Sequence, residues 1–262
     1  MSDDPRVPVR REPPRFRAAR VVASEPRSTS MQRLTLAGPD LVGLERGDAA
    51  SSVRLLLPAD EGELELPSWN GNEFLLGDGR RARIRTLTPL AVRERGGTAE
   101  LDVDVVLHGD SPLTRWARAA TPGTPAAVSG TGSGYVAPEG TTSLVVLGDE
   151  SAVPAVTTLL EDLPPELSVD VVLEHRHDAE PVELPDRDGA SVRWVVSAPD
   201  AAPCDALVAA ASNLEPPAGS QVWAAGEAAG VQRLRRRFFD ELGMSRRGSS
   251  IRGYWKHGRE GT

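Results

Sequence analysis

The sequence contains a single cysteine, Cys204, and no long run of apolar residues. One thiol cannot form an intramolecular disulfide, and it cannot build a cysteine-based zinc or iron–sulfur site, because each of these needs several thiols. Any redox centre must therefore be a bound cofactor. No stretch approaches the roughly 18 continuous apolar residues that a membrane-spanning helix requires. The sequence predicts a protein that does not cross a membrane.

The N-terminal segment lacks an apolar stretch after its arginines and prolines, so it does not match a secretory signal. We therefore expect a cytoplasmic protein in which residues 1–15 are disordered. The formal net charge of −8 argues against a nucleic-acid-binding protein, which needs a basic surface. Arginines nevertheless cluster in three places, which suggests an anionic ligand. These clusters are Arg10 to Arg20, Arg80 to Arg85 and Arg233 to Arg237.

The chain of 262 residues is long enough for two domains. In residues 16–132, short runs of β-forming residues alternate with turn residues, which predicts a small antiparallel β-barrel. One of these runs, ELDVDVVL, alternates acidic and apolar residues, as expected of a strand with one end at the surface. A helix follows it, in which Asp110 or Ser111 can serve as the cap and Pro112 can occupy the first turn.

The second half has a different pattern. The segment SLVVLGDESAVPAVTTLLEDL predicts a buried strand, a glycine turn and a helix, and further strands and helices alternate after it. Residues 141–262 are therefore expected to form an α/β domain with a parallel sheet. The connection between the domains is expected at residues 129–142, where glycine and proline accumulate.

The order of a barrel followed by an α/β domain does not by itself indicate a function. Four segments, however, resemble the siderophore-interacting protein family, which is itself similar to the ferredoxin-reductase flavoproteins. The resemblance runs from about Arg20 to Gly258. Its segments are NEFLLGDGRRARIRTLTP, VLHGDSPLTRWA, LGDESAVPA with TLLEDLP behind it, and VWAAGEAAGVQRLRR followed by RGYWKHGR. The resemblance implies an FAD-binding barrel followed by an NAD(P)H-binding α/β domain.

In the first segment, the resemblance implies that Arg85 and Thr88 bind FAD. An arginine can pair with the flavin pyrophosphate, and a threonine hydroxyl can reach the edge of the flavin ring. The chain departs from the family pattern at Leu87, where relatives carry an aromatic residue, and at Leu90, where an arginine is common. Taken alone, RTLT favours an exposed arginine beside a strand threonine, because four residues are a weak signal.

The second segment places Ser111 and Thr114 at a helix start, where free N–H groups attract phosphate. The alternative is that both hydroxyls only cap the helix. His108, at the end of the preceding strand, either faces the flavin or has a structural role.

The third and fourth segments supply two strand ends that would face one cleft at the carboxyl edge of the sheet. The resemblance assigns Gly148, Asp149, Glu150 and Ser151 to the first end and Gly226 with Glu227 to the second, near the nicotinamide cofactor. Taken alone, GDESAVP is also compatible with a tight strand-to-helix turn with an acidic cap.

Near the C-terminus, the resemblance places Tyr254 and Trp255 at the domain interface and assigns Lys256 to a basic pocket for an anionic ferric siderophore. A core-packed tail with a solvated lysine is the alternative. The arginine-rich helix at Arg233 to Arg237 is expected to be mainly a solvated face. Arg176, at the end of a strand, is a candidate for contact with the 2′-phosphate of NADPH.

The resemblance implies an enzyme that passes electrons from NAD(P)H through FAD to a ferric siderophore, and we expect it to be a monomer. Such chemistry requires no acid, base or nucleophile from the protein, so no catalytic residue and no metal ligand are assigned. Two alternatives stay open. One is a flavin-free protein of the same fold that binds a siderophore or a partner, and the other is a flavin reductase with a different electron acceptor.

Overall fold

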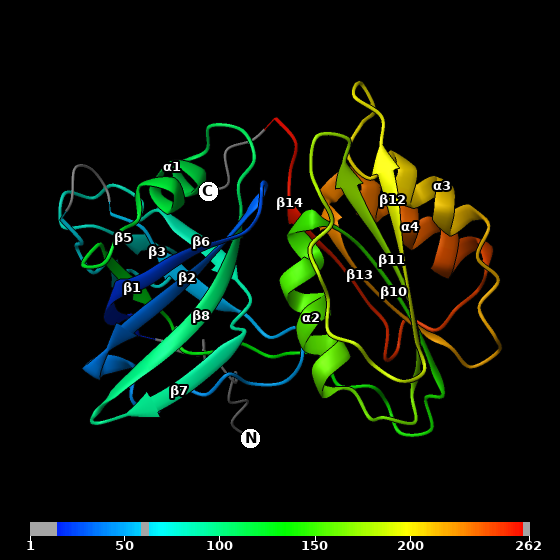
Figure 1. The fold of residues 1–262 in the computed structure, drawn as a ribbon, viewed down its shortest axis with the longest axis horizontal. Helices are drawn as coiled ribbons and strands as arrows, with labels where there is room; N and C mark the ends of the chain where they lie inside the picture. Colours follow the sequence, from blue (N-terminus) through cyan, green and yellow to red (C-terminus); the bar gives the residue numbers. More distant parts are fainter. Residues whose placement is uncertain (1–14, 59–62, 259–262) are drawn as a thin grey trace, which may run out of the picture.

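The computed structural model describes residues 15–58 and 63–258. The expected disorder of residues 1–15 falls almost wholly on residues outside the described part. Figure 1 shows two domains side by side: an antiparallel β domain formed by the first half of the chain, and an α/β domain formed by the second. Within the described residues, no helix is both long and apolar enough to span a membrane.

Seven strands form one sheet in the first domain, in the order β6-β3-β9-β1-β2-β8-β7. Its two edge strands, β6 and β7, do not pair with each other, so the barrel is open. Their bounds are β1 (Arg17–Ser28), β2 (Met31–Gly38), β3 (Val53–Leu56), β6 (Ile84–Leu87), β7 (Ala91–Arg95), β8 (Thr98–Val106) and β9 (Pro125–Val128). A separate hairpin consists of β4 (Ser68–Trp69) and β5 (Phe74–Leu75), and a short 3-10 helix, η1, spans Pro39–Leu41.

The predicted strand ELDVDVVL lies in β8, whose apolar residues point into the barrel core. Its acidic residues lie on the opposite face of the strand and pair with arginines. Asp104, for example, accepts two hydrogen bonds from the Arg33 guanidinium, at 2.8 and 2.9 Å. The helix α1 (Pro112–Ala119) follows β8, and the Ser111 hydroxyl accepts a hydrogen bond from the N–H of Thr114 at 3.1 Å. Of the two predicted caps, Ser111 is therefore the one used.

The second domain holds a parallel sheet in the order β12-β11-β10-β13-β14. Its strands are β10 (Ser143–Asp149), β11 (Ser168–Arg176), β12 (Ala190–Ser197), β13 (Gln221–Glu227) and β14 (Ser250–Trp255). Its helices are η2 (Glu150–Ala152), α2 (Val153–Asp162), α3 (Asp205–Ser212) and α4 (Ala228–Arg235), the last continued by a π-helical turn, η3 (Arg236–Glu241). The predicted connection, residues 129–142, contains no helix or strand.

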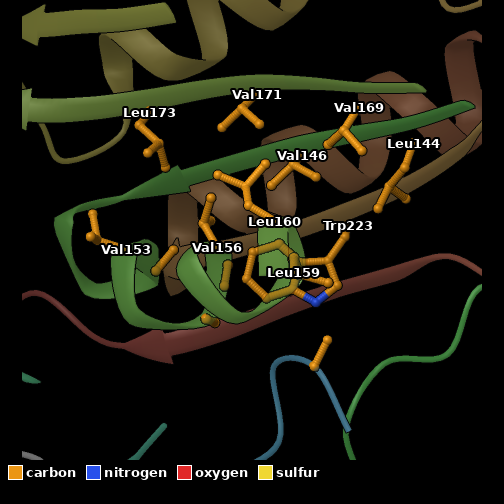
Figure 2. Close-up of a cluster of buried hydrophobic side chains, with 14 of the residues drawn as sticks. Leu144, Val146, Val153, Val156, Leu159, Leu160, Val169, Val171, Leu173 and Trp223 are labelled. Atoms are coloured by element: carbon orange, nitrogen blue, oxygen red, sulfur yellow. The ribbon is translucent and has the colours of Figure 1, made fainter. Parts of the chain in front are cut away.

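Helices cover both faces of the parallel sheet. On one face, Val153, Val156, Leu159 and Leu160 of α2 pack against the strands (Figure 2). On the other face, α3 and α4 pack against the strands around the fully buried Phe238. The fold-class prediction, an antiparallel barrel followed by an α/β domain with a parallel sheet, is confirmed.

The core on the α2 side continues into the first domain. It includes Met31 from the end of the β1–β2 hairpin and Tyr135 from the connection between the domains. The Tyr135 hydroxyl also donates a hydrogen bond to the carbonyl of Gly248 at 3.0 Å, and the N–H of Ala50 donates to the Thr158 hydroxyl at 2.8 Å. These contacts hold the two domains against each other.

Candidate functional site

The order of the parallel sheet reverses between β10 and β13, which are neighbours although they are far apart in the sequence. Ligands of open α/β sheets bind at such a switch point, outside the carboxyl ends of the strands. Gly148 and Asp149 end β10, and Gly226 and Glu227 end β13. The structure thus brings together the two strand ends that the sequence placed at one cleft.

Gly148 and Gly226 permit close packing at this edge. A Cβ atom on Gly148 would lie 2.3 Å from the Cβ of Ala152, so the glycine lets the chain turn tightly into η2. Gly226 has a φ of +156°, and a Cβ atom there would lie 2.8 Å from Asp149 Oδ2. Both glycines therefore accommodate contacts within the protein itself.

Asp149 is buried, with 8% of its surface exposed, and both of its carboxylate oxygens accept hydrogen bonds. Oδ1 accepts from the N–H and the hydroxyl of Ser151, at 2.9 and 2.5 Å. Oδ2 accepts from the N–H of Glu227 at 2.9 Å and from the indole Nε1 of Trp255 at 2.8 Å. The carboxylate thus joins the ends of β10, β13 and β14.

The thiol of Cys204 also lies against Asp149, with Sγ 3.7 Å from Oδ2. Burial, and then the charge of Asp149, raise the pKa of this thiol. A thiol that remains protonated is a poor nucleophile. Cys204 therefore acts as a packing residue beneath the strand ends.

Glu150 faces the first domain. Its Oε1 accepts a hydrogen bond from the Ser30 hydroxyl at 3.1 Å, and its Oε2 forms an ion pair with Arg176 Nε at 3.2 Å. Burial raises the pKa of the Glu150 carboxyl, although Arg176 and Ser30 act in the opposite direction. Arg176, the candidate for contact with a 2′-phosphate, is thus paired with Glu150 and, at 3.6 Å, with Asp178.

Glu227 caps helix α4 with its side chain. Its Oε2 accepts hydrogen bonds from the N–H groups of Ala229 and Gly230, at 2.6 and 3.0 Å, and its Oε1 accepts from the N–H of His257 at 3.1 Å. Burial acts to raise the pKa of Glu227, but the three N–H groups outweigh it, and the pKa lies below its usual value.

In the first domain, Arg85 lies on β6, an edge strand of the barrel. Its side chain is half-buried, and Nη1 donates to the carbonyl of Ile84 at 2.8 Å. Leu87, two residues further on, packs against the barrel core, and Thr88 is buried just beyond the end of the strand. One backbone edge of β6 has no neighbour within the seven-stranded sheet and can meet the polar edge of a planar ligand.

At the start of α1, the two predicted phosphate ligands interact with each other. The Ser111 hydroxyl lies 3.0 Å from the Thr114 hydroxyl, and Thr114 Oγ1 donates to the carbonyl of His108 at 3.0 Å. Both hydroxyls thus serve the helix cap and the preceding turn. The helix start keeps its positive dipole end, but these two hydroxyls already have partners.

The residues after β14 meet the barrel. The ring centroids of Trp255 and His108 are 5.2 Å apart, and Trp223 packs edge-on against Tyr254 at 6.3 Å. Tyr254 is 41% exposed, and Lys256 is exposed without a hydrogen bond or ion pair to any described residue. His108, Trp255 and Asp149 therefore form a continuous chain of contacts across the domain boundary.

The arginine-rich helix is a solvated face only in part, because three of its four arginines also bind acceptors within the protein. Arg233 pairs with Asp205 at 2.6 Å, Arg235 donates to the carbonyl of Ile251 at 3.1 Å, and Arg237 donates to the carbonyl of Ser212 at 3.0 Å. Only Arg236 is a solvated side chain of this group. The sequence pattern could not reveal this, because the acceptors lie at the ends of other elements.

Sequence reasoning also missed Ser30, which lies 120 residues before its partner Glu150. A serine in a hairpin turn is typical of turn chemistry, and no local pattern marks it as an interdomain contact.

An open antiparallel barrel followed by a parallel α/β domain, with the switch point of the parallel sheet in contact with the barrel, is the ferredoxin-reductase-like fold. A ferredoxin NADP+ reductase from Neisseria gonorrhoeae, solved with bound FAD and NADP, has this fold at a TM-score of 0.56 and 14% identity, over 92% of this chain and 98% of that one.

The chain belongs to the siderophore-interacting protein family. Residues 20–134 match the siderophore-interacting FAD-binding domain, and residues 141–258 match the siderophore-interacting protein domain. The predicted family and the predicted FAD cofactor are thereby confirmed.

Named relatives agree with this assignment. The chain is 29% identical to the ferric vibriobactin reductase ViuB of Vibrio cholerae over 88% of this chain and 86% of that protein. It is 30% identical to the NADPH-dependent ferric-chelate reductase of Escherichia coli over 91% and 92%. Among solved structures, a siderophore utilization protein from T. fusca superimposes with a TM-score of 0.79 at 31% identity, over 95% of both chains.

Proposed function

We propose that this protein is a ferric-siderophore reductase that uses NADPH or NADH and FAD. In this proposal, residues 16–132 carry the FAD and residues 141–262 carry the nicotinamide site and contact the siderophore. The observation that carries the proposal is that the switch point at the ends of β10 and β13 meets the FAD-binding domain, through the Glu150–Ser30 hydrogen bond and the contact of Trp255 with His108.

The residues of the first domain fit a flavin. Arg85 supplies a guanidinium on an edge strand of the seven-stranded sheet, and the start of α1 offers its positive dipole end to a pyrophosphate. Because Ser111 and Thr114 bond to each other, we assign any phosphate contact there chiefly to backbone N–H groups. Thr88 and His108 complete the barrel side of the proposed site.

Bound FAD supplies hydride acceptance and single-electron transfer, so that one NAD(P)H reduces two ferric ions to ferrous ions and yields NAD(P)+ and a proton. The protein's own task is to bind and orient. Asp149 and Glu227 hold the strand ends, and Glu150 ties them to the barrel through Ser30. Reduced iron is bound less tightly by hard siderophore oxygens and dissociates.

Lys256, with Tyr254 and Trp255, is the proposed contact for an anionic ferric siderophore. An exposed ammonium with no partner among the described residues, beside two aromatic rings, offers the chelate both charge and an apolar surface. The relatives named ferric vibriobactin reductase and NADPH-dependent ferric-chelate reductase support this substrate class. As part of the same proposal, the protein acts as a monomer in the cytoplasm.

The test is an absorbance scan of the purified protein with FAD, followed by addition of NADPH and then of a ferric tris-catecholate siderophore. We expect flavin bands, their bleaching by NADPH, and re-oxidation by the chelate with ferrous iron trapped by a ferrous-specific dye. Bleaching without re-oxidation by any ferric chelate would instead favour a flavin reductase with a different acceptor. A failure to take up flavin at high concentration would favour a flavin-free binding protein.

A further inference from the structure

Two buried carboxylates hold the short segment at the end of β14. The indole N–H of Trp255 donates to Asp149 Oδ2 at 2.8 Å, and the backbone N–H of His257 donates to Glu227 Oε1 at 3.1 Å. These carboxylates end two neighbouring strands, β10 and β13. The segment Trp255–His257 is therefore attached at both of its ends to the switch point of the sheet.

The strand geometry leads Trp255 to this position. Gly226 pairs with Gly253, but Glu227 pairs with Trp255, so Tyr254 is an extra residue on β14. Such a bulge interrupts the regular side-chain alternation of a strand and re-aims the residue that follows. The indole of Trp255 points to Asp149, and its ring also packs against His108 of the barrel.

Acidic residues beside a site for an anionic chelate would be expected to repel it. Here the two carboxylates are turned inward, with exposed fractions of 8% for Asp149 and 4% for Glu227, and both are surrounded by N–H donors. Their charges are thereby stabilised within the protein, and the group they leave at the surface is a lysine.

Lys256, which lies between the two anchored residues, is the only lysine in the chain. Its side chain is exposed and has no partner among the described residues. A lysine has a flexible four-carbon stem, so a fixed backbone is what limits the region its ammonium can reach. The two anchors fix that backbone from both sides.

We propose that Asp149 and Glu227 are positioning residues for substrate binding: acting through Trp255 and His257, they fix the place from which Lys256 meets an anionic ferric chelate. This inference rests on the proposed function, because it assumes that Lys256 contacts the chelate. It gives both strand-end carboxylates a role in binding the ferric chelate. Their position in the sheet alone would instead suggest a role in binding the nicotinamide cofactor.

The test uses Trp255→Phe, which keeps an aromatic ring but removes one hydrogen bond and leaves both helix caps intact. Asp200→Asn, at an exposed aspartate in the loop after β12, is the control. Hydrogen exchange at the amides of residues 255–257, followed in the flavin-free protein, reports the anchor directly. We expect exchange to become about tenfold faster in Trp255→Phe and to stay unchanged in Asp200→Asn.

Chelate binding is then measured with the gallium complex of a tris-catecholate siderophore, which is anionic and is not reduced. We expect the dissociation constant to rise about three- to tenfold in Trp255→Phe. Because the anchor acts through Lys256, adding Trp255→Phe to Lys256→Ala should weaken binding no further. Glu227→Gln should reproduce the single-variant effect, since a glutamine cannot accept from all three N–H groups with one oxygen.

Each failure has a different meaning. If hydrogen exchange at residues 255–257 is unchanged in Trp255→Phe, the hydrogen bond to Asp149 does not hold this segment, and the inference is wrong whatever the affinity for the chelate. Because Trp255→Phe keeps an aromatic ring for apolar contact with the chelate, faster exchange with additive losses in the double variant would show that the hydrogen bond does not act through Lys256, and the positioning role would be wrong. If Lys256→Ala leaves binding unchanged, the substrate role of Lys256 in the proposed function fails, and the positioning inference fails with it, while the exchange data still report the anchor.

Discussion

The imidazole of His108, at the end of the last barrel strand before α1, lies 5.2 Å from the indole of Trp255, at the end of the last strand of the α/β domain, with the rings tilted by 42°. The two rings form a contact between the domains beside the switch point of the parallel sheet. The separation of the ring centroids is within the range of interacting aromatic pairs. A change in the charge of His108 should therefore alter how firmly the domains hold together.

The first prediction concerns this histidine. Burial, and then the positive charge of Arg176, lower the pKa of His108 below its ordinary value of 6.5. The unfolded chain therefore binds this proton more readily than the folded chain, and this contribution to stability is present above pH 6.5 and lost as the pH falls through the folded pKa.

Urea unfolding of wild type and His108→Asn at a series of pH values checks this prediction. The difference between the two free energies of unfolding should change with pH below about 6.5 and level off above it. A difference that does not vary with pH would mean that His108 titrates as it does in the unfolded chain.

The second prediction concerns Arg85 and FAD. Arg85→Ala should weaken FAD binding by about 1.5 to 3 kcal/mol, the range for a hydrogen bond to a charged group. Isothermal titration of the flavin-free protein measures the dissociation constant. Arg118→Ala, at an exposed arginine on α1, is the control and should bind FAD as the wild type does. An unchanged dissociation constant in Arg85→Ala would remove this residue from the site.

The third prediction separates the iron step from the nicotinamide step. Lys256→Ala should raise KM for an anionic ferric siderophore by several-fold to about a hundredfold, equivalent to roughly 1 to 3 kcal/mol of lost binding. The loss should shrink at high salt, because the contact is exposed. Stopped-flow bleaching of the flavin by NADPH, without iron, should change far less. If iron reduction and flavin reduction slow equally in Lys256→Ala, the proposed basic pocket for the siderophore is wrong.

The fourth prediction concerns Arg187, whose guanidinium caps the carboxyl end of α2. It donates to the carbonyl of Leu160 in the last turn of α2 at 3.3 Å, and to those of Leu163 at 2.8 Å and Pro164 just beyond the helix. A cation at a helix C-terminus also interacts favourably with the helix dipole. Arg187→Ala should lower the free energy of unfolding by about 1 to 3 kcal/mol.

The urea midpoint measures this change. Arg193→Ala, at an exposed arginine on β12, is the control and should lie within about 0.5 kcal/mol of wild type. If the two variants unfold at the same concentration of urea, water replaces the Arg187 hydrogen bonds at the end of α2 without loss of stability, and the prediction is wrong.

Several features of the fold were predictable because they depend on neighbours in the sequence. The alternation in ELDVDVVL predicted β8, the continuous apolar run in SLVVLGD predicted a buried parallel strand, and Ser111 before Pro112 predicted the start of α1. Backbone hydrogen bonding and side-chain periodicity act over a few residues, so these patterns are visible in the chain itself.

The partners of the site residues were decided only by the tertiary structure. Asp149 stood out in the sequence as a residue of a strand-to-helix turn, but its indole donor is 106 positions away, and the bulge that directs Trp255 toward it depends on the pairing of β13 with β14. Likewise, the sequence alone indicates a solvated charged face at Arg233, Arg235 and Arg237. Their acceptors lie on or beside α3 and β14, which only the tertiary structure brings close to them. A buried carboxylate or guanidinium takes whichever donors or acceptors the packed elements leave beside it, and that choice is made by packing between distant segments, which no local pattern encodes.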